Sequence, residues 1–141
     1  MSNFTFQMIL RCSYTGDDND VSKSTVEHLV DGDWHELTLS TDSPGFDIFL
    51  YAILTCQHMY FKNNAAEYGL VMNSSEGFIT VIADEHRSIQ SLHVDFKGML
   101  KKGVASTEII DSIAARMDLC PVSINLKDFL DRKITVVFES S

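Results

Sequence analysis

The chain contains one long apolar stretch at residues 43–68, which reads SPGFDIFLYAILTCQHMYFKNNAAEY. Ser43 suits the N-cap of a helix and Pro44 its first position, and Asp47 lies near the first turn, where negative charge is favoured. Gly69 follows the stretch, and glycine commonly ends a helix. The sequence therefore predicts one helix here, which spans roughly 35–40 Å at about 1.5 Å per residue.

This predicted helix is apolar on nearly all sides between residues 46 and 61. A surface helix carries a single apolar stripe, and a small domain cannot easily surround a helix of this length. We therefore expect either an elongated domain or a second copy of the chain that covers the remainder. Cys56 lies near the middle of the helix and is the first candidate for chemistry.

Three strands are predicted before the helix. Residues 3–12 alternate apolar and polar side chains, residues 21–30 do so less regularly, and residues 34–40 form the third candidate. A turn rich in Asp and Asn separates the first two strands, and Asp31-Gly32 predicts a tight hairpin between the second and third.

The part of the chain after the helix alternates between strand and helix patterns. Strands are predicted at 70–72, 77–83, 89–96 and 134–138, with a loop or an interruption after the first and a basic loop at 98–103. A helix capped by Ser106 ends near Asp118, and a short further helix runs from Cys120 to about Leu130. The order βββ-α-ββ-αα-β, in a single domain of residues 1–141, is α+β, with antiparallel sheets wrapped around a long central helix.

Composition excludes several classes of partner. The formal net charge of −9 argues against nucleic acid, because neutralising phosphates requires clustered lysine and arginine. The sequence shows no signal peptide and no run of 18 uncharged apolar residues, so we expect a cytoplasmic protein with no membrane partner. Three cysteines, Cys12, Cys56 and Cys120, disfavour a structural disulfide framework, and any disulfide here would be redox-active.

The cysteines differ in their predicted surroundings. Cys120 precedes Pro121 at a predicted helix N-terminus, where free N–H groups favour a thiolate, although cysteine also serves there as a small cap or core residue. Cys56 lies inside an apolar helix, where a cysteine is usually inert packing. His58 is not expected to form a direct dyad with Cys56, because positions i and i+2 of a helix point to opposite sides.

No other motif supports a cofactor or a metal. The remaining histidines lack ligand-like spacing to one another or to a cysteine. The chain also lacks a glycine-rich phosphate loop and a nucleophile-elbow serine. We therefore expect neither a cofactor nor a bound metal.

Four short motifs together resemble the OsmC/Ohr family of hydroperoxide-reducing proteins. They are Pro-x-x-Asp at 44–47, Leu-Thr-Cys-Gln-His-Met at 54–59, Glu-Tyr-Gly-Leu at 67–70, and Cys-Pro-Val-Ser at 120–123 after an Ile-rich helix. Each motif alone is weak, but the combination is fairly specific and spans most of the chain from about residue 43 onward. The order βββ-α-ββ-αα-β agrees with this resemblance.

The resemblance implies an intertwined homodimer whose two long helices pack together at its centre. It implies that Cys56 is the peroxide-attacking thiolate and that Cys120 resolves the sulfenic acid into a disulfide, which a dithiol then reduces. The family's activating glutamate is loosely matched by Asp47, and its N-terminal arginine has only Arg11 and Lys23 as candidates. Without a cation, a cysteine in an apolar helix has a raised pKa and attacks slowly.

The function predicted from the resemblance is a thiol peroxidase that reduces organic hydroperoxides through Cys56 and Cys120. Two alternatives stay open. One is a non-catalytic protein that binds a small apolar ligand in a pocket at the dimer interface. The other is an oxidative-stress sensor whose disulfide changes its binding to a partner. If both cysteines were core residues, their thiols would be unreactive in the folded protein.

Overall fold

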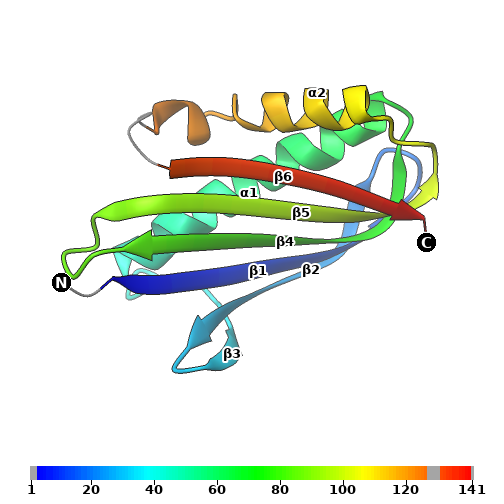
Figure 1. Cartoon of the computed structure of the whole chain (residues 1–141). Helices are drawn as coiled ribbons and strands as arrows, with labels where there is room; N and C mark the ends of the chain where they lie inside the picture. The colour runs from blue at the N-terminus through cyan, green and yellow to red at the C-terminus, as the bar shows by residue number, and fades with distance from the viewer. Residues whose placement is uncertain (1–2, 127–130, 141) are drawn as a thin grey trace.

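The computed structural model describes residues 3–126 and 131–140, and its six strands form one mixed sheet in the order β3-β2-β1-β4-β5-β6 (Figure 1). The strands are β1 (Phe4–Thr15), β2 (Asp20–Val30), β3 (Asp33–Glu36), β4 (Val71–Ala83), β5 (Ile89–Lys102) and β6 (Asp131–Ser140). Neighbouring strands are antiparallel except β5 and β6, which run parallel. The predicted α+β class is confirmed, but the prediction of purely antiparallel sheets is wrong for β6.

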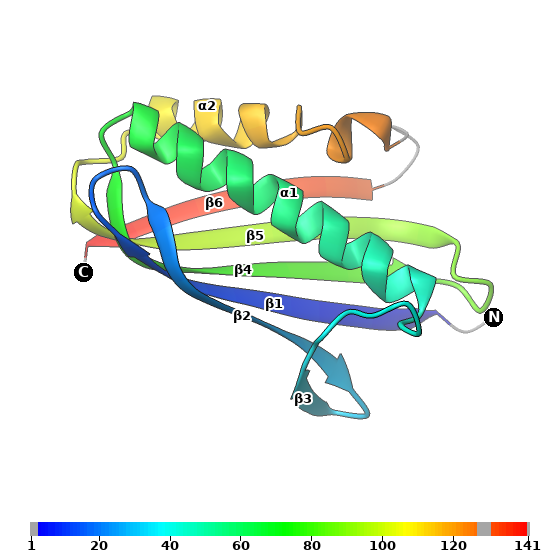
Figure 2. The ribbon, with the colours of Figure 1, turned by 180° about the vertical axis from the view of Figure 1, so that it is seen from behind.

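Two helices, α1 (Gly45–Glu67) and α2 (Thr107–Met117), lie on the same face of the sheet, as Figures 1 and 2 show from opposite sides. In Figure 2, α1 crosses the sheet diagonally, and α2 lies beside it along β6. Within the described ranges, neither helix is long and apolar enough to cross a membrane. The opposite face of the sheet carries no helix from the described residues, so the core lies between the sheet and the two helices.

The ends of α1 follow the sequence closely. Asp47 lies in the first turn, and Gly69, with φ of +74°, follows the last turn as predicted. The helix begins one residue later than predicted, with Pro44 at the N-cap position. Ser43 is not the cap, because its hydroxyl accepts a hydrogen bond from the Ser40 N–H at 2.9 Å.

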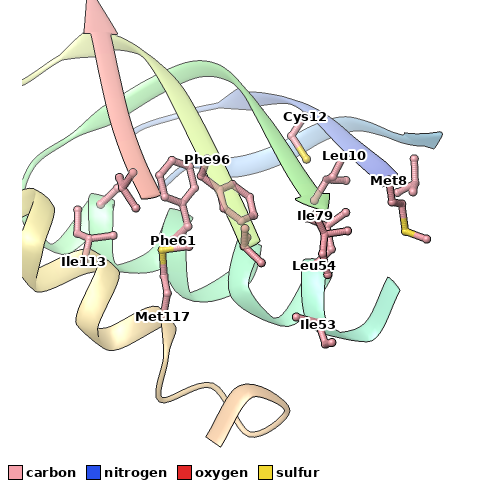
Figure 3. Packing of buried hydrophobic residues seen from close by; sticks show 14 of the residues in the cluster. Met8, Leu10, Cys12, Ile53, Leu54, Phe61, Ile79, Phe96, Ile113 and Met117 are labelled. Carbon is pink, nitrogen blue, oxygen red and sulfur yellow. The ribbon is translucent and has the colours of Figure 1, made fainter. Parts of the chain in front are cut away.

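One side of α1 forms the centre of the core. Leu54 and Phe61 are fully buried against the sheet, and the Phe61 and Phe96 rings stack with centroids 4.9 Å apart (Figure 3). Ile113 and Met117 of α2 are fully buried in the same cluster. Burying each side chain of this size stabilises the fold by roughly 1.5–3 kcal/mol. This packing fixes the rotation of α1 about its axis and therefore decides which residues it turns away from the sheet.

Three predicted boundaries are wrong, two of them because of strand pairing. Residues 98–103 are not a loop, because β5 continues to Lys102, which pairs with Val71. The polar residues 73–76 do not interrupt β4, because they lie within the continuous strand, and its Ser74 and Glu76 pair with residues of β1. The third strand ends at Glu36 instead of residue 40.

The predicted helix from Cys120 to Leu130 is also wrong where the structure describes it. The chain there forms only the short 3₁₀ helix η1 (Ser123–Asn125), and residues 127–130 lie outside the described residues. Proline is accommodated near the start of both an α-helix and a 3₁₀ helix. The Cys-Pro sequence alone therefore does not determine which of the two forms or how long it is. The Ser106 cap of α2 is confirmed, since its hydroxyl accepts a hydrogen bond from the Ile109 N–H at 3.2 Å.

Candidate functional site

The structure brings Cys56 and Cys120 together, although they lie on different elements. Cys56 is in the middle of α1, and Cys120 lies between α2 and η1, which itself contacts α1. The two side chains lie close enough for Cys120 to raise the pKa of Cys56, and both are free thiols. Cys120 is fully buried, whereas Cys56 is partly exposed. Of the two sulfurs, that of Cys56 is therefore the one that a small molecule can reach.

The turn after α2 directs hydrogen-bonding groups at Cys120. The backbone N–H of Ser123 donates to Cys120 Sγ at 3.2 Å, and Ser123 Oγ lies 3.0 Å from the same sulfur. The Ile124 N–H donates to the Cys120 carbonyl at 2.9 Å and closes the turn. A hydroxyl accepts from a thiol and donates to a thiolate, so Ser123 can bond the sulfur of Cys120 in either protonation state.

Burial raises the pKa of the Cys56 thiol above its usual value, because a thiolate is poorly solvated beside the apolar helix. The hydrogen bond with Cys120 raises this pKa further, and a backbone hydrogen bond from Val122 acts in the opposite direction. None of these groups is a cation. The direction of this shift agrees with the raised pKa expected for a cysteine in an apolar helix.

The structure does not bring the two candidate cations to Cys56 within one protomer. Arg11 lies on the sheet face opposite the helices, where it donates to Glu76 Oε2 at 3.2 Å and pairs with Glu27. Lys23 is opposite Ser13 in the β1–β2 register, on the same outer face. In a strand, alternate residues face opposite sides, so side chains on this face cannot reach α1.

Asp47 is also distant from the thiols along α1. It precedes Cys56 by nine positions, which is roughly 13–14 Å along a helix axis. Its carboxylate instead lies 3.9 Å from His28 Nδ1 of β2. An activating role for Asp47 at Cys56 therefore has no support in the geometry of one protomer.

Sequence reasoning missed a buried polar cluster around His58. The Tyr14 hydroxyl lies 2.7 Å from His58 Nε2 and 2.5 Å from Ser75 Oγ. Burial, aided by the charge of Lys62, lowers the pKa of His58 to about 4. His58 faces the sheet, which agrees with the prediction that it forms no direct dyad with Cys56. The three bonded side chains come from β1, α1 and β4, so no local sequence pattern connects them.

Gln57 is the second residue that sequence reasoning missed. Its side chain is buried, and its Nε2 donates to Ser123 Oγ at 2.9 Å, which links α1 to the turn that carries Cys120. The only sequence signal for Gln57 is its position next to Cys56. Across the described part of the chain, no group of three or more His, Cys, Asp or Glu side chains is arranged to hold a metal.

The sequence itself matches neither a protein-family model nor a curated protein. Solved structures do match in fold. An OsmC-like hydroperoxide resistance protein from Jannaschia sp. is 10% identical, with a TM-score of 0.58 over 86% of this chain and 85% of that chain. An OsmC-like protein from Mycoplasma pneumoniae is 13% identical, with a TM-score of 0.53 over 92% of this chain and 94% of that chain.

A hypothetical protein from Aquifex aeolicus, 10% identical, matches with a TM-score of 0.58 over 94% of this chain and 96% of that chain. At these identities the likeness establishes the fold. The chain therefore has an OsmC-like fold, as the resemblance of its sequence motifs predicted.

Proposed function

We propose that this chain is a thiol peroxidase that reduces organic hydroperoxides through Cys56 and Cys120. The observation that carries the proposal is the pair of neighbouring free thiols, Cys56 and Cys120, in an OsmC-like fold. A hydroperoxide resistance protein with this fold supports the choice of substrate class. The residues 1–141 would act as one domain, without a cofactor.

The proposed reaction uses each thiol once. The Cys56 thiolate attacks the outer oxygen of the hydroperoxide, the O–O bond breaks, and the alkoxide takes a proton and leaves as the alcohol. Cys56 is then a sulfenic acid, and the Cys120 thiol displaces its oxygen as water to form a disulfide. A dithiol reduces that disulfide and restores both thiols. Because Cys120 already lies near enough to influence Cys56, the second step needs little rearrangement of the backbone.

The environment of Cys56 predicts slow turnover at neutral pH. Only the thiolate attacks peroxide, and burial together with Cys120 holds Cys56 in the thiol form. The groups that shift this pKa include no cation to counter the burial. This feature also favours the second candidate function, a redox sensor that forms the same disulfide without rapid turnover.

We further propose that the protein acts as a homodimer joined through α1. The side of α1 that faces away from the sheet exposes three large apolar side chains, Ile48 at 40%, Phe49 at 38% and Met59 at 56%. Cys56 is partly exposed beside Met59, one helical turn earlier. Exposed large apolar side chains gathered on one side of a helix are typical of an interaction site. A second α1 on this surface would enclose Cys56 and complete its surroundings.

Mass spectrometry after one equivalent of cumene hydroperoxide tests the peroxidase proposal. We expect a Cys56–Cys120 disulfide in the wild type, a Cys56 sulfenic acid that dimedone traps in Cys120→Ser, and no oxidation in Cys56→Ser. Cys12→Ala is the matched control, because Cys12 is buried in the sheet and lies outside the pair. It should behave like the wild type.

The proposal is wrong if neither a disulfide nor a sulfenic acid forms while Cys56→Ser behaves like the wild type. Steady-state consumption of the peroxide with a dithiol distinguishes the two redox functions. A peroxidase turns over many times, whereas a sensor forms the disulfide once and changes conformation without sustained consumption.

A further inference from the structure

The sulfur of Cys120 meets two groups of a single residue, Ser123. The Ser123 N–H donates to Cys120 Sγ at 3.2 Å, and Ser123 Oγ lies 3.0 Å from the same sulfur. The exposed fractions of Cys120 and Ser123 are 0% and 1%, so water has little access to either bond. The state of this sulfur is therefore set by its protein neighbours.

These two bonds leave one lone pair of the Cys120 sulfur free. A thiol sulfur carries one proton, which is a weak donor, and two lone pairs, which are weak acceptors. In the reduced protein the Ser123 hydroxyl accepts the bond from the thiol proton, and the Ser123 N–H occupies one lone pair. Cys120 also lies close enough to Cys56 to raise the pKa of that thiol. The Cys56 sulfur is thus the neighbour that the remaining lone pair can attack.

Gln57 holds the Ser123 hydroxyl from the helix that carries Cys56. Its side chain is buried, and its Nε2 donates to Ser123 Oγ at 2.9 Å. Arg132 of β6 holds the same residue from the other side, because its Nη1 donates to the Ser123 carbonyl at 3.2 Å. Ser123 is therefore fixed relative to both α1 and the sheet.

The polar side chain of Gln57 is costly for stability at its position. Gln57 Oε1 is buried and has no hydrogen-bond partner among the described residues. An unpaired buried carbonyl destabilises the folded state, and an apolar side chain of the same length would avoid that loss. Features that reduce stability are concentrated at functional sites. The bond that Gln57 Nε2 makes to Ser123 therefore explains this residue better than packing does.

We propose that Ser123 is a catalytic residue of the step that joins Cys120 to Cys56, and that Gln57 positions it. The inference rests on the proposed redox function of the two cysteines. In this step a lone pair of Cys120 Sγ attacks the sulfur of the Cys56 sulfenic acid and the S–O bond breaks. The oxygen leaves as hydroxide and becomes water with the proton that Cys120 loses. Ser123 keeps the thiol proton turned to itself, so that the attacking lone pair is free.

A series of hydroperoxide concentrations separates this step from the attack on peroxide. Sulfenic acid formation is proportional to the peroxide concentration, whereas disulfide formation does not involve peroxide and sets a plateau. Rapid quenching with a thiol-blocking reagent, followed by mass spectrometry, measures both after addition of cumene hydroperoxide. We expect Ser123→Ala to lower the plateau about ten-fold and to leave the initial slope unchanged, because it removes a hydrogen bond to the attacking sulfur. Ser123→Thr keeps the hydroxyl and should restore most of the plateau.

Overoxidation of Cys56 gives a second readout of the same step. A sulfenic acid that waits for Cys120 reacts with a second hydroperoxide, which becomes an alcohol while the sulfur becomes a sulfinic acid. Cys56 sulfinic acid should therefore accumulate in Ser123→Ala at peroxide concentrations that leave the wild type in the disulfide form. A residue that only stabilised the fold would not change this ratio.

Gln57→Met separates positioning from stability. It keeps the length of the side chain and removes both the donor to Ser123 and the unpaired carbonyl. We expect its plateau to fall while its midpoint of urea unfolding does not fall below that of the wild type. Ser112→Ala is the matched control, because the Ser112 hydroxyl is partly buried and bonds Tyr68 Oη at 2.6 Å, outside the thiol pair. It should leave the slope and the plateau unchanged.

The proposal is overturned if Ser123→Ala and Gln57→Met both reach the wild-type plateau, or if Ser112→Ala lowers the plateau as much as they do. Where Ser123→Ala fails to fold, the plateau of Gln57→Met decides. A failure of the proposed function looks different, because the wild type itself would then form neither sulfenic acid nor disulfide, and the role of Ser123 would fall with it.

Discussion

Because His58 is buried, we expect the free energy of unfolding to fall at mildly acidic pH. The imidazole is buried and shares a hydrogen-bond network with Tyr14 and Ser75. Burial is the main cause that lowers its pKa to about 4, from an ordinary value of 6.5, and the positive charge of Lys62 adds to the effect. The folded protein therefore resists a proton that the unfolded chain accepts.

The sign of the effect follows from where the proton binds. Above pH 6.5, His58 is neutral in both states and adds no pH dependence. Between pH 6.5 and 4 the unfolded chain binds a proton that the folded protein does not, so the free energy of unfolding falls as the pH falls. The loss from this residue is roughly 2 kcal/mol by pH 5 and about 3 kcal/mol below pH 4, at about 1.4 kcal/mol for each pKa unit.

Urea unfolding at pH 7.5 and pH 5.0, at one protein concentration, measures this loss. His58→Gln keeps a hydrogen-bonding side chain but cannot be protonated, so it should lose about 2 kcal/mol of the wild-type pH dependence. His86→Gln is the control, because the His86 side chain is 83% exposed, and it should retain the wild-type dependence. Equal pH dependences in the wild type and His58→Gln would refute the reasoning.

Three further predictions concern the thiol, the fold and the dimer. The rate of Cys56 sulfenic acid formation should still rise above pH 9 in stopped-flow assays, because the pKa of Cys56 is raised, and a plateau near neutrality would contradict this. Asn19→Ala should lower the free energy of unfolding in urea by roughly 3 kcal/mol, because buried Asn19 has φ of +56° and bonds three backbone groups. Asn19→Gly should lower the same free energy by about 1 kcal/mol less, because glycine tolerates that φ. Met59→Glu should shift sedimentation from dimer to monomer at micromolar concentration, and an unchanged profile would exclude this face of α1 as the interface.

The sequence predicted most of what depends on local patterns. The long helix, its end at Gly69, the Ser106 cap and the Asp31-Gly32 hairpin all follow from residue types at fixed positions. The errors concern elements whose state is set by a distant partner. Polar residues in the middle of β4 resemble a loop until β1 is seen to pair with them.

The candidate site likewise has features that the sequence predicts and features that depend on distant partners. That Cys56 is helical and that His58 points away from it followed from helix geometry alone. The cations could not be placed, because whether Arg11 faces α1 or the opposite side depends on strand register, and a shift of one residue reverses every side chain. In the structure Arg11 lies on the outer face with Glu27 and Glu76.

The contact between Cys56 and Cys120 depends on how α1, α2 and the following turn pack, which no spacing rule determines. Ser123 shows why this matters for chemistry. Its hydroxyl bonds both Cys120 Sγ and Gln57 Nε2, so one side chain joins the thiol pair to the helix residue next to Cys56.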